Sequence, residues 1–152
     1  MDPEWRREQL QVLLEKVDRG RVNGLGCDFY DLSLAKNRRN RGNYQGPAYG
    51  RVKIKFTDNS KKVILAHRLM YMLHKNSLHI PPGKHVSHIC HNTLCINPVH
   101  LSLEDAQVNN DRKMCKQLVP QVCLKHPGYP DCLFEGKSTI LFCCKNVLVS
   151  SV

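Results

Sequence analysis

The 152-residue sequence predicts a small α+β domain in which structural zinc sites support a modest hydrophobic core. Two observations predict this class. Cysteine and histidine recur at zinc-ligand spacings in two stretches, residues 88–100 and 115–132. Between the N-terminal helix signal and these stretches, residues 51–66 have the pattern of two half-buried antiparallel strands. The length suits a single domain spanning residues 1–152.

Composition predicts the class of partner and the redox setting. Lys and Arg number 23 against 13 Asp and Glu, a net charge of +10 that favours a polyanion, nucleic acid before an anionic membrane. No run is apolar enough to span a bilayer and no signal-peptide core is present, so we expect an intracellular, nuclear protein without a membrane partner. Eight cysteines then favour metal over disulfides. The alternative is a secreted four-disulfide domain, against which the interleaved histidines argue.

The N-terminal third predicts a helix, a strand and a basic loop. Asp2 and Pro3 read as a cap and first-turn proline of a helix that runs to about Asp18, within residues 1–20. Residues 27–34 predict a strand that opens a basic β-sheet region, 27–66. The polar loop that follows is either solvated or binds phosphate. Its candidate DNA-binding residues are Arg38, Arg39 and Arg41.

Residues 51–56 alternate strictly and predict a half-buried strand. Residues 61–66 predict its antiparallel partner. One face carries Arg51, Lys53 and Lys55, and the other carries Val52, Ile54 and Phe56. A two-stranded ribbon with a cationic face fits the DNA major groove. The alternative is an ordinary hairpin whose lysines keep it in solution.

The next elements predict a strand–loop–strand–helix unit over residues 85–114. Residues 67–75 read as a core helix in which His67 is a structural histidine, and a Pro-Pro-Gly turn follows at 81–83. Short strands are expected at 85–89 and 99–103. Residues 104–114 then read as a polar helix whose first two carboxylates suit the helix dipole.

The loop of this unit carries the first ligand set. Cys90, Cys95 and His100 follow a C-x4-C-x4-H spacing that suits three ligands of one tetrahedral zinc. His88 lies two residues before Cys90, so a metal clamp here would fix the backbone that presents His88.

A second set follows in the segment 115–132. Its C-x7-C-x2-H-x5-C spacing offers three sulfurs and one nitrogen to a structural zinc. The members are Cys115, Cys123, His126 and Cys132. The apolar tail, residues 138–152, holds Cys143 and Cys144, which we interpret as free or buried thiols; one of them replacing an assigned ligand stays open.

Residues 87–101 read S-H-I-C-H-N-T-L-C-I-N-P-V-H-L. This stretch resembles the box S-H-x-C-H-N-T-x-C-x-N-P-x-H-L of the His-Cys box homing endonucleases, within the His-Me finger (ββα-metal) nucleases. Upstream, residues 49–51 and 66–68, Y-G-R and A-H-R, look like the lead-in of related HNH nucleases.

The resemblance implies a ββα-metal core, double-stranded DNA as substrate, and a homodimer in which the tail contacts the partner. It implies that His88 is the general base, that Asn109 binds one catalytic Mg²⁺, and that Arg51 contacts the phosphate. It also implies two structural zinc ions, bound by Cys27, Cys90, Cys95 and His100 and by Cys115, Cys123, His126 and Cys132. The second set departs from the family spacing by one residue before Cys123 and one before His126. For the first zinc, His91 is the alternative fourth ligand.

These observations predict a site-specific, metal-dependent DNA endonuclease. A zinc-stabilised DNA-binding module that has lost cleavage is the alternative from another class, and loss of His88 or Asn109 would mark it. Both residues are present, which favours the nuclease. A nonspecific or RNA-directed nuclease is a third reading, because phosphate contacts carry no sequence information.

Overall fold

The computed structural model describes residues 1–21, 23–31, 48–56 and 58–135. The predicted basic loop with Arg38, Arg39 and Arg41 lies outside the described residues. So does the tail with Cys143 and Cys144.

Helix α1 (Pro3–Leu14) begins as predicted, because the Asp2 side chain accepts a hydrogen bond from Trp5 N at 2.7 Å. The helix ends four residues before the predicted Asp18. Beyond it the backbone pairs with residues 29–31 instead of continuing the helix, with Asp18 N donating to Phe29 O at 2.7 Å. The predicted strand 27–34 is wrong over its described part, since residues 29 and 30 form only isolated bridges.

Strands β1 (Arg51–Lys55) and β2 (Lys61–Leu65) form an antiparallel ribbon that confirms the alternation in the sequence. Val52 and Ile54 are buried, whereas the three cations of β1 are exposed. Helix α2 (Ala66–His74) follows β2 directly, within one residue of its prediction, and its Leu69 and Leu73 are fully buried in the same core.

Strands β3 (Lys84–His88) and β4 (Leu101–Asp105) form a second antiparallel pair, joined through a 3₁₀ turn η2 (Pro98–His100), and α3 (Ala106–Gln117) follows. Strand β4 lies two residues later than predicted, and the helix starts later as a result. Glu104 is therefore a strand residue and does not cap a helix. It is fully buried and pairs with Arg112, because a buried carboxylate needs a charged partner.

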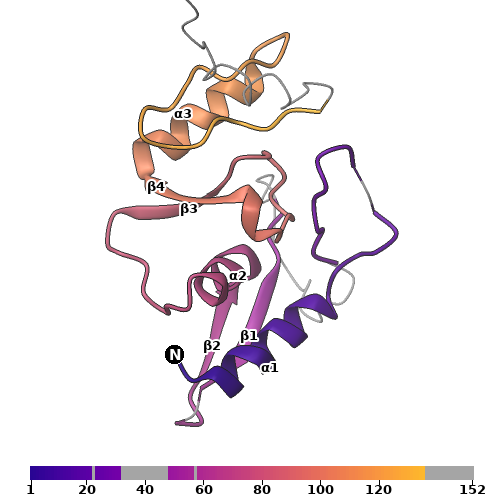
Figure 1. Cartoon of the computed structure of the whole chain (residues 1–152), viewed down its shortest axis with the longest axis vertical. Coiled ribbons are helices and arrows are strands. Elements are labelled where there is room, and N and C mark those ends of the chain that lie inside the picture. Colours follow the sequence, from indigo (N-terminus) through magenta and orange to yellow (C-terminus); the bar gives the residue numbers. More distant parts are fainter. Residues whose placement is uncertain (22, 32–47, 57, 136–152) are drawn as a thin grey trace, which may run out of the picture.

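The elements gather at two opposite ends of the molecule, with β3 and β4 between them (Figure 1). The β1–β2 ribbon, α1 and α2 occupy one end, and α3 with the chain after it occupies the other. This arrangement places the 88–100 loop between the two ends. None of the helices in the described ranges is long and apolar enough to cross a membrane.

Gly50 precedes β1 at a point where no side chain fits. A Cβ there would lie 2.6 Å from two ring carbons of Tyr30 and 3.0 Å from the Ala66 Cβ. We expect Gly50→Ala to lower the free energy of unfolding by about 1–3 kcal/mol, the usual effect of overpacking, in urea denaturation. Gly24→Ala is the matched control, because nothing lies within 4 Å of a Cβ at that position. Equal stability of the two variants would contradict this packing.

Candidate metal centres and the surroundings of His88

Four side chains of the first predicted set come together in a buried cluster: Cys27, Cys90, Cys95 and His100. Their ligand atoms all lie within 4.8 Å of one another. The Sγ atoms of Cys27 and Cys95 are each 3.5 Å from Nδ1 of His100. Zn–S and Zn–N bonds of about 2.3 and 2.0–2.1 Å at tetrahedral angles place S and N about 3.6 Å apart. The cluster therefore has the size and donor set of a zinc site.

Local backbone structure brings these ligands together. Cys95 N donates to Asn92 O at 2.9 Å in a tight turn, and the Asn97 side chain caps the 3₁₀ turn that ends in His100. The bridge between Phe29 and Cys95 holds the upstream chain against this loop, which brings in Cys27. His91, the alternative fourth ligand, is not a member of this cluster. Its ring instead stacks on Phe134, with ring centroids 5.0 Å apart.

The second predicted set also forms a cluster, made of Cys115, Cys123, His126 and Cys132. His126 Nε2 lies 3.5 Å from Cys115 Sγ and 3.4 Å from Cys132 Sγ. Backbone N–H groups point at two of the sulfurs, from Leu124 to Cys115 and from Cys132 to Cys123, both at 3.3 Å. Such donors stabilise thiolates, the form that binds metal. Despite the spacing departures, the predicted four residues meet.

The thiols of the first cluster interact strongly with one another. A hydrogen bond from Cys95 lowers the pKa of Cys90 to about 6, while the same interaction raises the pKa of Cys95. Burial raises the pKa of Cys27. One thiolate is thus favoured at neutral pH, and a divalent cation would supply the positive charge that the remaining thiols need to ionise.

His88 lies at the end of β3, buried against the first cluster. Its Nε2 is 3.0 Å from the backbone O of Cys95. Because a carbonyl only accepts, Nε2 carries the hydrogen and the lone pair of the neutral ring is on Nδ1. Burial lowers the pKa of His88 to about 4, well below the ordinary value of a histidine. The ring is therefore neutral at pH 7, the form that can accept a proton.

Two aromatic neighbours surround His88 that sequence reasoning did not assign to the site. The ring centroid of His67, on α2, is 4.5 Å from that of His88, and Tyr49 is 6.2 Å away. Burial lowers the pKa of His67 to about 3, so this ring is also neutral. Its Nδ1 is buried and has no hydrogen-bond partner within the described ranges. His67 belongs to the A-H-R motif and Tyr49 to the Y-G-R motif, so these two motifs were the sequence signal that could have assigned both residues to the site.

The other two predicted catalytic residues lie on neighbouring elements. Asn109 is half-buried on α3, and its Nδ2 lies 3.2 Å from Nδ1 of His85. Arg51 is exposed at the start of β1, two residues after Tyr49, which contacts His88. Within the described part of the chain, no hydrogen bond or ring contact links His88, Asn109 and Arg51 to one another.

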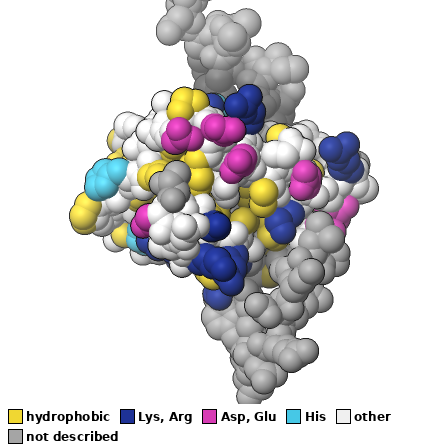
Figure 2. Space-filling view, turned by 90° about the horizontal axis from the view of Figure 1, so that it is seen from below, with side chains coloured by type: hydrophobic (Ala, Val, Ile, Leu, Met, Phe, Trp, Pro, Cys, Tyr) yellow, Lys and Arg dark blue, Asp and Glu magenta, His cyan; other side chains and the backbone are white. Residues whose placement is uncertain are grey.

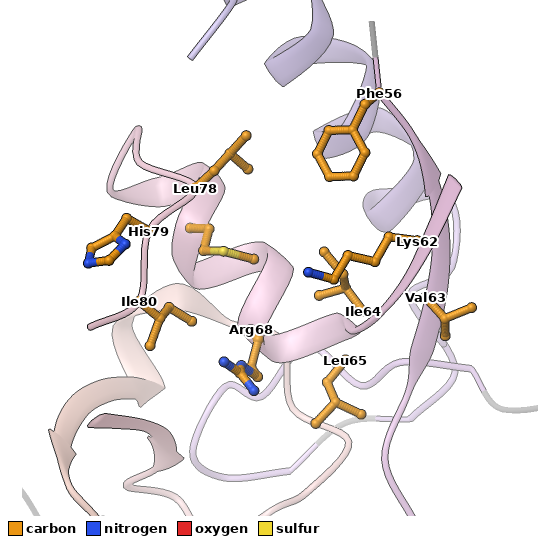
Figure 3. A pocket seen from close by; sticks show the side chains of 10 residues that line it. Phe56, Lys62, Val63, Ile64, Leu65, Arg68, Leu78, His79 and Ile80 are labelled. Carbon is orange, nitrogen blue, oxygen red and sulfur yellow. The ribbon is translucent and has the colours of Figure 1, made fainter. Parts of the chain in front are cut away.

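The surface carries charges of both signs at the end of the molecule opposite α3. Figure 2 views this end and shows Asp and Glu side chains beside Lys and Arg. A separate groove of about 380 Å³ lies between β2, α2 and residues 78–80 (Figure 3). Arg68, Lys62 and His79 lie among its apolar walls, but neither His88 nor a Cys/His cluster lines it. It is therefore not part of the site described above.

Two buried Cys₃His clusters in a small α+β chain have the donor sets of structural zinc sites, and this defines the class of a small zinc-binding protein. The chain belongs to the family described as the zinc-binding loop region of homing endonuclease, whose sequence model matches residues 33–143. This membership confirms the resemblance to His-Cys box nucleases of the His-Me finger group, and it indicates a nuclease.

A curated relative is similar over part of its length. The chain is 34% identical over 99 residues to Protein 2.8 of Escherichia phage T7, covering 64% of this chain and 57% of that protein. No solved structure matches the chain.

Proposed function

We propose that the chain is a metal-dependent endonuclease that hydrolyses phosphodiester bonds of double-stranded DNA at specific sites, acting as a homodimer. In this proposal β3, β4 and α3 form a ββα-metal core and residues 1–152 a single domain. Family membership supports the reaction class. The observation that carries the proposal is the contact of His88 Nε2 with the Cys95 carbonyl, which leaves Nδ1 as a neutral base beside the first cluster.

Phosphodiester hydrolysis needs a water that loses its proton as it attacks phosphorus. A neutral imidazole with a fixed orientation does this as a general base. The Cys95 carbonyl prevents the His88 ring from rotating, and Cys95 is itself a member of the buried cluster. We therefore assign the proton transfer to Nδ1 of His88.

Both zinc ions would have structural roles in this mechanism. Each cluster offers four protein ligands, so neither leaves an open position for water or substrate. The first would hold the loop that orients His88, and the second would hold the segment after α3.

Asn109 is the proposed ligand of the catalytic metal. An amide oxygen is a hard donor of the kind that Mg²⁺ takes, and Mg²⁺ is commonly held by one or two protein oxygens together with substrate oxygens. When bound, this ion would stabilise the negative charge on the leaving 3′ oxygen. His85 would keep the amide nitrogen of Asn109 occupied, since its Nδ1 is within hydrogen-bond distance of that nitrogen.

The cations of the ribbon are the proposed DNA contacts. Arg51 would neutralise the phosphate that is attacked, and its place after Tyr49 supports a position near His88. Lys53 and Lys55 are exposed on the same face of β1 and would contact the backbone on either side. Arg38, Arg39 and Arg41 stay predictions, as do the tail-mediated dimer and the nuclear location.

A cleavage assay tests the proposed function. Zinc-loaded protein is incubated with supercoiled plasmids, a library of random-sequence duplexes and a structured RNA, with Mg²⁺ or without it. We expect Mg²⁺-dependent cutting of a subset of the duplexes. Binding to DNA without any cleavage would indicate the silent binding module, and cutting of all substrates alike would indicate a nonspecific nuclease.

Asn109→Ala is expected to lower single-turnover cleavage about 100-fold at a fixed Mg²⁺ concentration, because a metal ligand contributes several kcal/mol to the transition state. Raising Mg²⁺ should restore part of the rate. The matched control is Asn110→Ala, since the Asn110 side chain is exposed and accepts a hydrogen bond from Lys113, away from His85. Equal rates for the two variants would remove Asn109 from the mechanism.

A further inference from the structure

Arg112 of α3 is almost completely buried, with 2% of its surface exposed. A buried guanidinium is costly unless it is fully paired. Its Nε lies 2.8 and 3.0 Å from the two carboxylate oxygens of Glu104, and its Nη2 lies 2.8 Å from one of them. This geometry is the bidentate fork that arginine forms with a carboxylate.

Arg112 also contacts the second cluster. Nη2 donates to the backbone O of Pro130 at 2.7 Å, and Nη1 lies 3.5 Å from the Sγ of Cys132. Cys132 is one of the four clustered ligands, so Arg112 fixes both a ligand sulfur and the loop that carries it. A cation beside a ligand sulfur stabilises the thiolate, and such outer contacts orient metal ligands.

Glu104 continues the chain of contacts to β3. Its Oε1 accepts a hydrogen bond from the Oγ of Ser87, and Ser87 immediately precedes His88. Since adjacent strand residues point to opposite faces, a fixed Ser87 side chain sets the direction in which His88 points. A continuous set of buried polar contacts thus runs from Cys132 to the residue next to His88.

We propose that Arg112 is a positioning residue that couples the second Cys/His site to the strand bearing His88. Its effect on cleavage rests on the proposed function, whereas the coupling between the metal site and β3 does not. A lysine at this position keeps the charge but cannot bond the carboxylate, Pro130 and Cys132 together, because it has one ammonium in place of the planar fork.

The first test uses the zinc-loaded protein without DNA. Zinc transfer to a chromogenic chelator is followed for wild type, Arg112→Lys and the control Lys113→Gln, an exposed position on the same helix. In Arg112→Lys we expect one zinc equivalent to leave at least about tenfold faster and the other at the wild-type rate. We also expect faster hydrogen exchange of amides 84–88. Wild-type behaviour of either the zinc or these amides would overturn the coupling.

Ser87→Ala carries the test if Arg112→Lys does not fold. This variant removes only the last link, so amides 84–88 should exchange faster while both zinc equivalents leave at the wild-type rate. Unchanged exchange would overturn the proposal.

With cleavable DNA, Arg112→Lys should lower kcat about tenfold with KM unchanged; a change in KM alone would contradict a positioning role. If no DNA is cleaved, the proposed function fails and the zinc and exchange results still decide the coupling.

Discussion

Cys95→Ser is expected to remove one of two zinc equivalents and to unfold most of the protein at 25 °C. The Cys95 side chain is completely buried in the first cluster. Zinc binding in structural sites supplies about 10–16 kcal/mol of folding free energy at pH 7, as much as the whole stability of a typical domain, about 5–15 kcal/mol. Cys115→Ser should remove the other equivalent.

Zinc content by elemental analysis and circular dichroism measure this outcome. Lys113→Gln, an exposed position outside both clusters, is the control and should keep two equivalents and the wild-type melting curve. Fewer than two equivalents in the wild-type protein, or a Cys95→Ser variant that has lost one equivalent and stays folded, would contradict the structural role of the sites.

His88→Ala is expected to lower single-turnover DNA cleavage by about 10²–10⁴-fold, the usual contribution of a general base. DNA affinity should change little, because the neutral, buried ring adds no cation to the surface. Cleavage of a saturating duplex and a parallel binding titration separate the two effects.

His79→Ala is the control for that measurement, since His79 is exposed in the separate groove of Figure 3. A His88→Ala variant that cuts at the wild-type rate would exclude His88 as the base. A loss of binding that matches the loss of rate would instead make it a structural residue.

The ligand spacings predicted much of the site because zinc ligands lie close together along the chain. Both clusters contain the predicted residues. Spacing alone could not find Cys27, which a long-range backbone bridge brings to the loop; the family resemblance pointed to it. The strict alternation at 51–55 predicted β1, because one face of the strand is buried and the other exposed.

The sequence alone could not predict the roles of residues that depend on tertiary pairing. Glu104 reads as a helix-opening carboxylate, but it is a strand residue because it pairs with His85 of β3, and the buried Arg112 neutralises its side chain. Likewise, nothing local to residues 15–18 ends α1, where pairing with residues 29–31 replaces the last helical turn. The lowered pKa of His88 also follows from burial under α2, which the box motif does not encode.

The central claim is that the first Cys/His site holds His88 as a neutral base with its lone pair on Nδ1. The tautomer of His88 in the zinc-loaded protein at pH 7, measured by ¹⁵N NMR of the labelled imidazole, tests it most directly. We predict a neutral ring with hydrogen on Nε2, bonded to the Cys95 carbonyl. Hydrogen on Nδ1, or a charged ring, would contradict the account.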